Sequence, residues 1–298
     1  MQITYITPIY KSDEFNIRML YKSLQKQTNP NWIWFIYDDN EDLSQNTARD
    51  FICDLIDRNN PIYDNRVIFV EHEYFCEMKG SGPAKYMAFK KAEQFISTRD
   101  CEVFCELDHD DLLDKECTET ILSLYEQTHF DFLHADTVVL KDDFNPALTY
   151  FSKVEPFTHP IFGYQDVGDV VYAEVTIPNI VRKLITMNIR CYNRFFYKSI
   201  GGFDYNVAFG EDFDILIKIA CSAKKIVYAR KILYYYNFND NCNSSKINCE
   251  EVFNQIIEKN KGLINMFQNS QTIIDDNSLD NKGYMLYHNE QIINSNGN

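Results

Sequence analysis

Residues 1–140 alternate short, continuous apolar runs with segments in which apolar side chains recur at helical spacing. A continuous apolar run predicts a strand that is buried on both faces, and the helical recurrence predicts a helix with one buried face. Strands are accordingly predicted at residues 3–6, 32–37, 67–70 and 103–107. Helices are predicted at residues 17–24 and 46–56, and from Pro83, which is well tolerated in a first helical turn, to about Ile96.

This alternation predicts an α/β fold with a doubly wound, mainly parallel sheet flanked by helices. Ligands of such sheets bind beyond the carboxyl ends of the strands. The segments that directly follow strands are therefore the first candidates for a functional site, and all should line one rim. They are Thr7-Pro8-Ile9-Tyr10, Asp38-Asp39-Asn40 and Asp108-His109-Asp110-Asp111.

The pattern changes after about residue 140. Residues 141–189 hold scattered prolines, aromatics and acids without a period, which predicts an irregular, substrate-facing insertion. Asn248 and Glu251 have the spacing of a capping box for a helix over residues 250–267. Residues 269–298 are polar and predict a loosely held tail, although residues 284–287 could dock. The other elements predicted in this half are strands at 189–197, 226–229 and 232–238 and a helix at 211–221.

Composition narrows the function classes. The 298 residues include 44 acidic and 29 basic side chains, for a formal net charge of −15, which disfavours a nucleic-acid partner. A phosphate ligand stays possible if a metal cation bridges it to carboxylates. The 9 cysteines are odd in number and include no C-x-x-C pair, so we expect reduced, mostly buried thiols and no zinc site. The N-terminus resembles no signal peptide and no run is long enough to span a membrane, so a cytoplasmic protein is expected.

Two of the post-strand segments carry paired acids. Asp108, Asp110 and Asp111 follow a buried strand, where like charges repel and raise one another's pKa. A hard divalent cation relieves this repulsion and can bridge to phosphate oxygens. A carboxylate of Asp38-Asp39 can accept hydrogen bonds from a base imide or a ribose hydroxyl. The structural alternative for both segments is a solvated turn or a helix cap, with Asp111 or Asp114 as the cap in the first.

A third acidic segment follows the turn Gly201-Gly202. Gly210-Glu211-Asp212 places carboxylates at the start of a predicted helix, where the positive end of the helix dipole stabilises an anion. Asp212 can then stay ionised and accept a proton. The alternative is that Glu211 or Asp212 only caps the helix.

In their order and spacing, these segments resemble family 2 glycosyltransferases of the GT-A fold, which are metal-dependent inverting enzymes that use nucleotide-diphosphate sugars. The resemblance covers about residues 1–240, and residues 30–95 also look like the spore-coat polysaccharide transferase branch. The matching pieces are Ile6-Thr7-Pro8-Ile9-Tyr10, Ser23-Leu24-Gln25-Lys26-Gln27-Thr28, Ile36-Tyr37-Asp38-Asp39-Asn40, Glu106-Leu107-Asp108-His109-Asp110-Asp111, Ile200-Gly201-Gly202-Phe203-Asp204 and Gly210-Glu211-Asp212-Phe213-Asp214-Ile215.

The resemblance implies a role for each matching residue. Asp212 is the general base for the acceptor hydroxyl, and Asp110 binds Mn²⁺ or Mg²⁺ together with the diphosphate. His109, between the two acids, is the variable residue of a D-x-D motif and is expected not to be a ligand. The residues implied to bind the nucleotide are Thr7, Pro8 and Tyr10 at the base, Asp39 at the uracil, Asp108 at the ribose and Lys85 at the base or phosphate. A solvated helix lysine is the alternative for Lys85.

The resemblance also divides the chain. Residues 1–240 form a GT-A domain, with a nucleotide-sugar-binding half at 1–112 and an acceptor or catalytic half at 113–240. Residues 241–268 are a loop and helix, and 269–298 the flexible tail. Many relatives carry Arg and His in the loop that here spans residues 236–245, but this loop has neither. The Q-x-x-R-W motif of processive synthases is absent too, so one sugar per visit is expected.

The expected function is therefore inverting transfer from a nucleotide-diphosphate sugar, a UDP-sugar in the first instance, to a hydroxyl of a glycan or glycoconjugate. One alternative is a non-catalytic carbohydrate-binding protein that retains the fold. A second is a nucleotidyltransferase, which needs a Gly-rich basic loop after the first strand that Thr7-Pro8-Ile9-Tyr10-Lys11 does not provide. A third is a DNA-modifying glycosyltransferase, which the net charge disfavours.

Overall fold

The structure is a computed structural model of the chain. It describes residues 1–40, 46–72, 79–96, 101–141, 175–176, 188–238, 248–267, 270–274 and 284–291. The predicted insertion at 141–189 lies almost entirely outside these residues.

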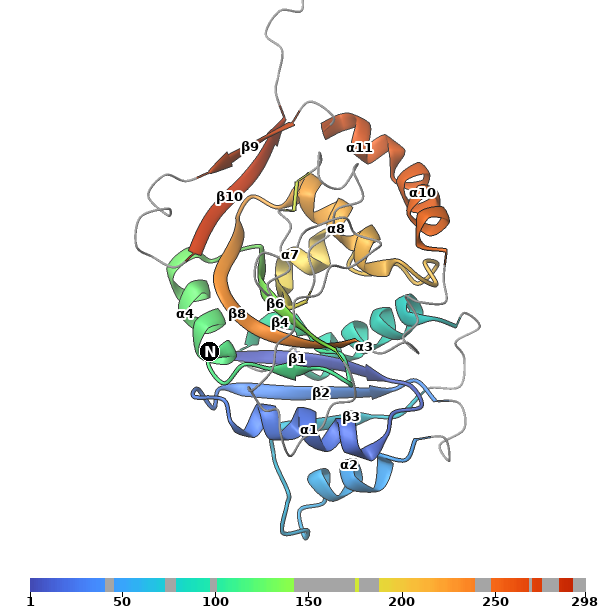
Figure 1. Cartoon of the computed structure of the whole chain (residues 1–298), viewed down its shortest axis with the longest axis vertical. Helices are drawn as coiled ribbons and strands as arrows, with labels where there is room; N and C mark the ends of the chain where they lie inside the picture. Colours follow the sequence, from blue (N-terminus) through green and yellow to red (C-terminus); the bar gives the residue numbers. More distant parts are fainter. Residues whose placement is uncertain are drawn as a thin grey trace, which may run out of the picture.

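Strands and helices alternate through the first half of the chain, as predicted (Figure 1). This half contains β1 (Gln2–Ile9), α1 (Glu14–Gln25), β2 (Trp32–Asp38), α2 (Arg49–Ile56), β3 (Val67–Val70), α3 (Ser81–Ile96), β4 (Cys101–Glu106), β5 (Leu112–Leu113), α4 (Cys117–Thr128) and β6 (Phe132–Lys141). The second half contains β7 (Arg190–Asn193), α7 (Arg194–Ser199), α8 (Glu211–Ser222), β8 (Ile226–Phe238), α10 (Cys249–Lys259), α11 (Lys261–Phe267), β9 (Ser270–Ile274) and β10 (Tyr284–Gln291).

The strands form one sheet in the order β3-β2-β1-β4-β7-β6-β8-β10-β9, and β5 pairs with β8. The neighbours β3, β2, β1 and β4 are mutually parallel, so the predicted doubly wound arrangement is confirmed for this part. β7 runs antiparallel to both β4 and β6, β8 is parallel to β6, and β10 and β9 add antiparallel strands. The whole sheet is therefore mixed.

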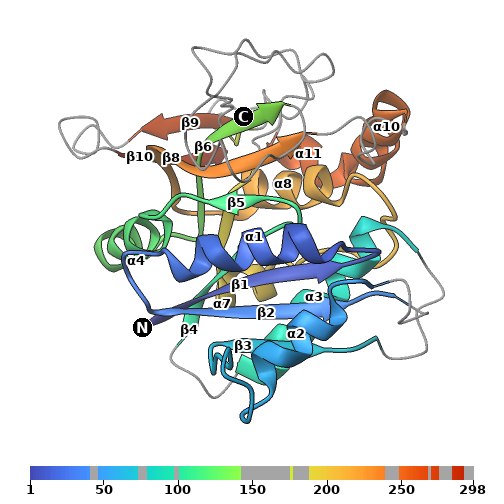
Figure 2. The ribbon, with the colours of Figure 1, turned by 60° about the horizontal axis from the view of Figure 1, so that its bottom comes forward.

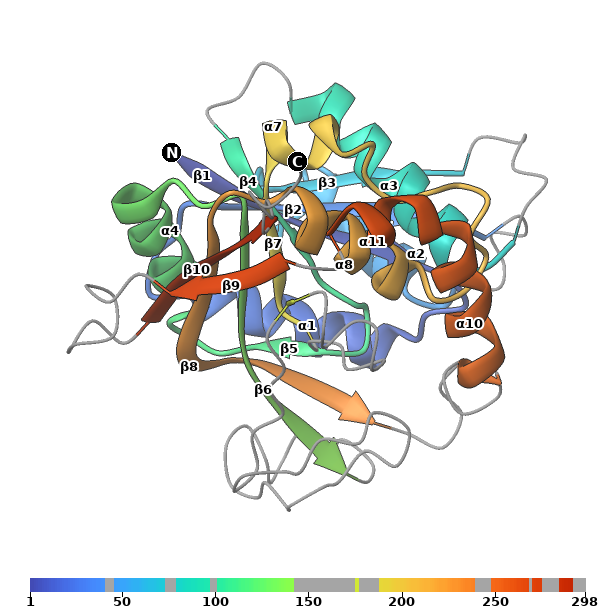
Figure 3. The same cartoon turned by 90° about the horizontal axis from the view of Figure 1, so that it is seen from above.

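Helices cover both faces of the sheet. This explains why β2 is apolar or aromatic from Trp32 to Tyr37. Trp32, Trp34 and Ile36 enter the core under α1, α2 and α4, while Ile33 and Phe35 enter the core under α3, α7, α8, α10 and α11. Because successive side chains of a strand point to opposite faces, a strand between two helical layers must be apolar at every position. Figure 2 looks onto β1, β2 and β3 with α1 and α2 in front, and Figure 3 shows the other side, with α8, α10 and α11 in front.

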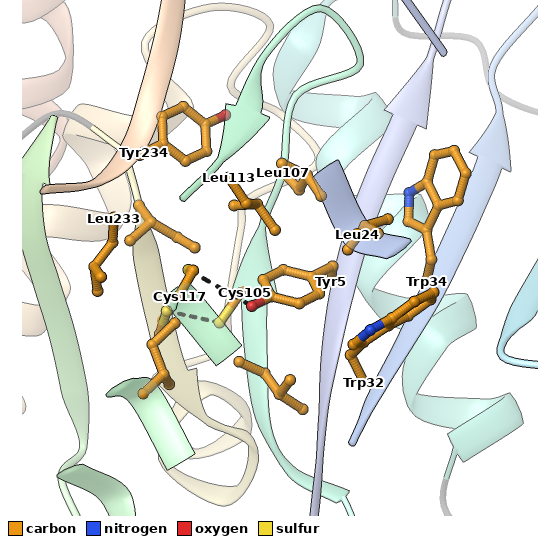
Figure 4. Close-up of a cluster of buried hydrophobic side chains, with 14 of the residues drawn as sticks. Tyr5, Leu24, Trp32, Trp34, Cys105, Leu107, Leu113, Cys117, Leu233 and Tyr234 are labelled. Atoms are coloured by element: carbon orange, nitrogen blue, oxygen red, sulfur yellow. Dashed lines mark hydrogen bonds between the residues drawn. The ribbon is translucent and has the colours of Figure 1, made fainter. Parts of the chain in front are cut away.

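The core under α1 and α4 also holds most of the buried thiols (Figure 4). The hydroxyl of Tyr5 lies 3.0 Å from Thr118 Oγ1 and 3.6 Å from Cys117 Sγ. Burial raises the pKa of the Cys117 thiol well above its usual range, which keeps it protonated. None of the seven cysteines within the described residues forms a disulfide.

Three predicted boundaries are wrong. The strand expected at 189–197 ends at Asn193, because the Asn193 side chain accepts hydrogen bonds from the Phe195 and Phe196 amides and starts α7. The helix expected at 250–267 starts with the predicted Asn248 cap but is interrupted at Asn260. The two strands expected at 226–229 and 232–238 are one strand, since shifts in its register with β6 accommodate the irregular residues between them.

The expectation of a loosely held tail is wrong for residues 270–274 and 288–291, and the docking that was kept open for residues 284–287 is confirmed. These residues form β9 and β10, and β10 pairs with β8 in the central sheet. Tyr284, Met285 and Tyr287 are buried, and the Tyr287 hydroxyl lies 2.9 Å from His134 Nε2. Each such side chain contributes about 1.5–3 kcal/mol when it leaves water, which is why a polar segment with three large apolar residues docks. Among the described residues, no helix is long and apolar enough to cross a membrane.

Candidate active site

The carboxyl ends of β1, β2 and β4 lie at one edge of the sheet. Ile9 pairs with Asp38 of β2, and Ile6 pairs with Glu106 of β4. The Asp39 amide donates to the Ile9 carbonyl at 2.9 Å, so the pairing continues just past the strand ends. The prediction that the three post-strand segments share one rim is confirmed by this register.

The four residues that follow or end β1 are divided between core and surface. Tyr10 is 53% exposed, and Pro8 is half-buried. Thr7 is fully buried, and its Oγ1 accepts a hydrogen bond of 2.9 Å from the Trp34 indole. The Thr7 side chain therefore packs under the rim, while the ring of Tyr10 is open to a ligand.

Of the pair Asp38-Asp39, one side chain is likewise buried and the other partly exposed. Asp38 is fully buried and accepts hydrogen bonds from the side chains of Asn40 at 2.6 Å and Asn46 at 2.8 Å. Asp39 has a side chain 19% exposed, with His72 Nδ1 at 3.7 Å from Oδ1. Asp38 thus supports the turn, and Asp39 is the member of the pair that reaches the rim.

The acids after β4 take three different positions. Asp111 is fully buried and accepts 2.7 Å hydrogen bonds from the Tyr234 hydroxyl and the Asn237 amide, so it fixes β8. Asp108 has a side chain 28% exposed, and its Oδ2 accepts a 2.9 Å hydrogen bond from Asn188. Asp110 is partly buried and makes no ion pair or side-chain hydrogen bond with any described residue.

The environment of Asp110 fits the cation that the resemblance implies. Burial and then the nearby Asp108 raise the pKa of the Asp110 carboxyl, although His109 opposes the shift. A carboxylate destabilised in this way gains from a hard cation, which prefers oxygen ligands. No group of three or more His, Cys, Asp or Glu side chains among the described residues could hold a metal ion.

The N-termini of α3 and α8 meet beside this rim. Gly82 donates its amide to the Ala208 carbonyl at 3.2 Å, and a Cβ on Gly82 would lie 1.7 Å from the Val207 carbonyl oxygen. Only glycine permits this approach. It places Ser81 of α3 at 2.7 Å from Glu211 Oε2 of α8.

Lys85 lies in the interior of the site. Its ammonium is 2.8 Å from Glu106 Oε2, 3.3 Å from Glu211 Oε1 and 3.9 Å from Asp108 Oδ1. Burial lowers its pKa, but these three carboxylates more than offset burial, so the pKa is raised and the ammonium stays charged. The alternative of a solvated helix lysine is wrong, because only 9% of the side chain is exposed.

The three acids at the start of α8 differ in burial and in their contacts. Asp212 has a side chain 28% exposed, and its Oδ2 lies 3.3 Å from Arg190 Nη2. Glu211 is buried against Ser81 and Lys85, and burial raises its pKa. Asp214 is buried and accepts hydrogen bonds of 2.8 Å from Lys259 and 2.9 Å from Asn260, which hold α10 and its C-cap against α8. Of these three acids, Asp212 is the one that reaches the surface of the site.

Two further charged residues, Glu106 and Arg190, lie in the site and had no role predicted from the sequence. Glu106 is 1% exposed and bonds Lys85, Arg190 and the Tyr192 hydroxyl, and Arg190 is 4% exposed between Glu106 and Asp212. The sequence did contain a signal that both residues are paired in the interior. Each is a charged residue inside a run that otherwise predicts a buried strand, and charges are buried only when they are paired.

A scan against protein-family models finds no match to the chain, and a search of curated proteins finds none. Solved structures do match. TarS of S. aureus, residues 1–349 in complex with UDP, aligns at a TM-score of 0.58 with 19% identity, over 89% of this chain and 64% of that one. The complex of the same region with UDP-GlcNAc aligns at 0.57 with 18% identity, over 87% and 66%.

These matches, with the sheet topology, show that the chain has the GT-A fold. The chain spans just under two thirds of TarS residues 1–349 and 39% of the longer TarS structure. The structures named above are of TarS and do not support the spore-coat branch that residues 30–95 suggested.

Proposed function

We propose that the chain transfers a sugar from a nucleotide-diphosphate sugar, a UDP-sugar in the first instance, to an acceptor hydroxyl with inversion, in the presence of Mn²⁺ or Mg²⁺. The observation that carries this proposal is the gathering of Asp39, Asp108 and Asp110 at one sheet edge with Asp212 beside them. TarS, which shares the fold, has been solved with UDP and with UDP-GlcNAc, and this supports UDP as the nucleotide. A glycan or glycoconjugate is the proposed acceptor, and family 2 is the proposed family.

The nucleotide is proposed to bind along the rim. The exposed ring of Tyr10 can stack on the base, and Pro8 beside it offers apolar surface. Asp39 accepts a hydrogen bond from the imide N–H of uracil, and Asp108 accepts hydrogen bonds from the ribose hydroxyls. Thr7 supports this arrangement from the core through its bond to Trp34.

Charge balance supports a cation at the diphosphate. The buried cations Lys85 and Arg190 face four carboxylates, which are those of Glu106, Asp108, Glu211 and Asp212. An anionic donor would be repelled by the remaining negative charge. Asp110, together with the diphosphate, is proposed to hold Mn²⁺ or Mg²⁺. When bound, the ion supplies Lewis-acid stabilisation of the charge that develops on the leaving diphosphate.

Asp212 is proposed to carry out the proton transfer. Its carboxylate takes the proton from the acceptor hydroxyl as the oxygen attacks the anomeric carbon. The bond between that carbon and the diphosphate oxygen breaks on the opposite face, so the configuration inverts and UDP leaves.

The proposal is tested by a screen of nucleotide sugars for release of free nucleotide, with and without Mn²⁺, in the presence of simple glycan acceptors. At least one UDP-sugar should be turned over with Mn²⁺ and not with EDTA, and Asp212→Asn should abolish most of that turnover. Binding of a nucleotide sugar with no turnover by the parent chain would favour the non-catalytic alternative.

A further inference from the structure

A chain of buried charges runs under the site and ends at Asp212. Arg190 Nη1 lies 3.3 Å from Glu106 Oε2, and Arg190 Nη2 lies 3.3 Å from Asp212 Oδ2. Glu106 is itself held by Lys85 at 2.8 Å and by the Tyr192 hydroxyl. The guanidinium of Arg190 therefore bridges a fully buried carboxylate and a partly exposed one.

Both members of the inner pair keep their charge. Burial lowers the pKa of Arg190, but Glu106 and Asp212 more than offset it and raise that pKa. Burial raises the pKa of Glu106, and Lys85 and Arg190 more than offset it in turn, so the pKa is lowered. Because the pair is charged and inaccessible, Arg190 has a fixed place from which its second nitrogen reaches the site.

The contacts of Asp212 leave it oriented but still able to accept a proton. Oδ1 accepts the amide of Phe213 at 2.8 Å, and Oδ2 faces Arg190. Each carboxylate oxygen can accept two hydrogen bonds, so one acceptor position on each remains for an acceptor hydroxyl. A lysine at position 190 would keep the positive charge but lose the planar fork that lets arginine bond two carboxylates in fixed directions.

We propose that Arg190, anchored by Glu106, is a positioning residue that holds the carboxylate of Asp212 toward the acceptor hydroxyl. This inference rests on the proposed function, in which Asp212 is the base. Its competitor is a purely structural Arg190 that only neutralises Glu106. In that case the orientation of Asp212 does not depend on Arg190.

A double-mutant cycle between Arg190→Lys and Asp212→Asn distinguishes the positioning role of Arg190 from the purely structural one. Arg190→Lys should lower kcat by about 10–100-fold, because small misplacement of a catalytic group has effects of this size. KM for the donor and the affinity for UDP should stay within about 2-fold, since donor binding does not use Asp212. In the double variant, Arg190→Lys should cause no further loss beyond Asp212→Asn, because the group that it positions is already inactive.

Arg66→Lys is the matched control. Arg66 also makes a two-pronged bond to a carboxylate, with Nε 2.9 Å from Asp64 Oδ1 and Nη2 2.7 Å from Oδ2, but it lies outside the site. It should leave kcat unchanged. Glu106→Gln is the second variant if Arg190→Lys does not fold. It keeps the side-chain shape while freeing Arg190, and it should show the same loss in kcat and the same lack of additivity.

Two results would overturn the inference in distinguishable ways. If Arg190→Lys and Glu106→Gln slow the Asp212→Asn enzyme by the same factor as the parent, Arg190 does not act through Asp212, and the proposed function is untouched. If Asp212→Asn itself keeps full activity, the role of Asp212 as base fails, and the positioning role of Arg190 fails with it.

Discussion

Two short runs of acidic side chains, residues 108–111 and 211–214, border the site, and the fold divides them in the same way. The last acid of each is a buried anchor, which is Asp111 for β8 and Asp214 for α10. An earlier acid of each stays partly exposed at the site, which is Asp110 in one run and Asp212 in the other. Each run therefore contains one buried structural acid and one partly exposed acid that is proposed to be functional.

The two runs differ in what neutralises them. Around the α8 run, Arg190, Lys85, Lys218 and Lys259 all lie within ion-pair distance of a carboxylate. Around the β4 run, Lys85 reaches only Asp108, at 3.9 Å, and no described lysine or arginine forms an ion pair with Asp110. The protein's own cations thus neutralise the α8 run, whereas the β4 run is where we propose that a cation binds from outside.

The largest effect is expected at the functional member of the α8 run. Asp212→Asn keeps the side-chain shape and removes the basicity, so sugar transfer should fall by roughly 10²–10⁴-fold. The affinity for UDP should change little, because Asp39 and the rim carry that binding. Transfer rate, melting temperature and UDP affinity should be measured on the same preparation.

Glu258→Gln is a control for Asp212→Asn, since Glu258 is an exposed acid whose one ion pair within the described part of the chain is with Lys261. It should be fully active. The cap interpretation predicts instead that Asp212→Asn lowers stability by about 1 kcal/mol with nearly normal turnover, and that result would contradict the catalytic assignment.

The anchor of the α8 run should affect stability and not chemistry. Asp214→Asn leaves Lys218 and Lys259 without a buried partner, and it should lower the free energy of unfolding by about 3 kcal/mol at neutral pH. Burial raises the pKa of Asp214, but Lys218, Lys259 and Asn260 more than offset it, so the folded pKa lies below the ordinary one. The stabilisation is therefore present above about pH 4 and is lost as pH falls through the folded pKa.

Denaturant unfolding of the parent and Asp214→Asn at several pH values checks this. The difference between the two should shrink in acid. A difference that is constant with pH would mean that Asp214 stabilises the chain through its shape and not through its charge.

The anchor of the β4 run should have the smallest effect. Asp111→Asn keeps one acceptor oxygen for Tyr234 or Asn237 but turns an N–H toward the other donor, for a loss of about 1 kcal/mol. The loss is smaller than for Asp214 because no cation among the described residues pairs with Asp111. Thermal unfolding of both variants tests the order, and a larger loss for Asp111→Asn would reverse the comparison.

The sequence predicted the parallel half of the fold well because its signals are local. Apolar runs and helical spacing define β1, β2, β3 and β4, and the register of parallel strands then brings the post-strand residues together. The sequence offered the docking of residues 284–287 in β10 only as a possibility, because three large side chains in a polar segment are a weak local signal. Their docking depends on β8, which is distant in sequence.

The site was predicted in part for a similar reason. The acids at the rim follow strands and can be found by position. The division of each run into anchor and functional member depends on Tyr234, Asn237, Lys259 and Arg190, which lie 22 to 126 positions away in the sequence from the acids that they contact. No rule of sequence spacing connects these residues to the acids. Contacts between distant parts of the chain therefore decide which acid is buried and which reaches the surface of the site.

The central claim is that the β4 run uses a cation from outside to hold a nucleotide diphosphate. Calorimetry with UDP tests it directly, on the parent, on Asp110→Ala and on Asp57→Ala, whose acid is exposed on the surface. The parent and Asp57→Ala should bind UDP tightly with Mn²⁺ and weakly with EDTA, and Asp110→Ala should bind weakly in both. Equal affinity of the parent with Mn²⁺ and with EDTA would contradict the claim.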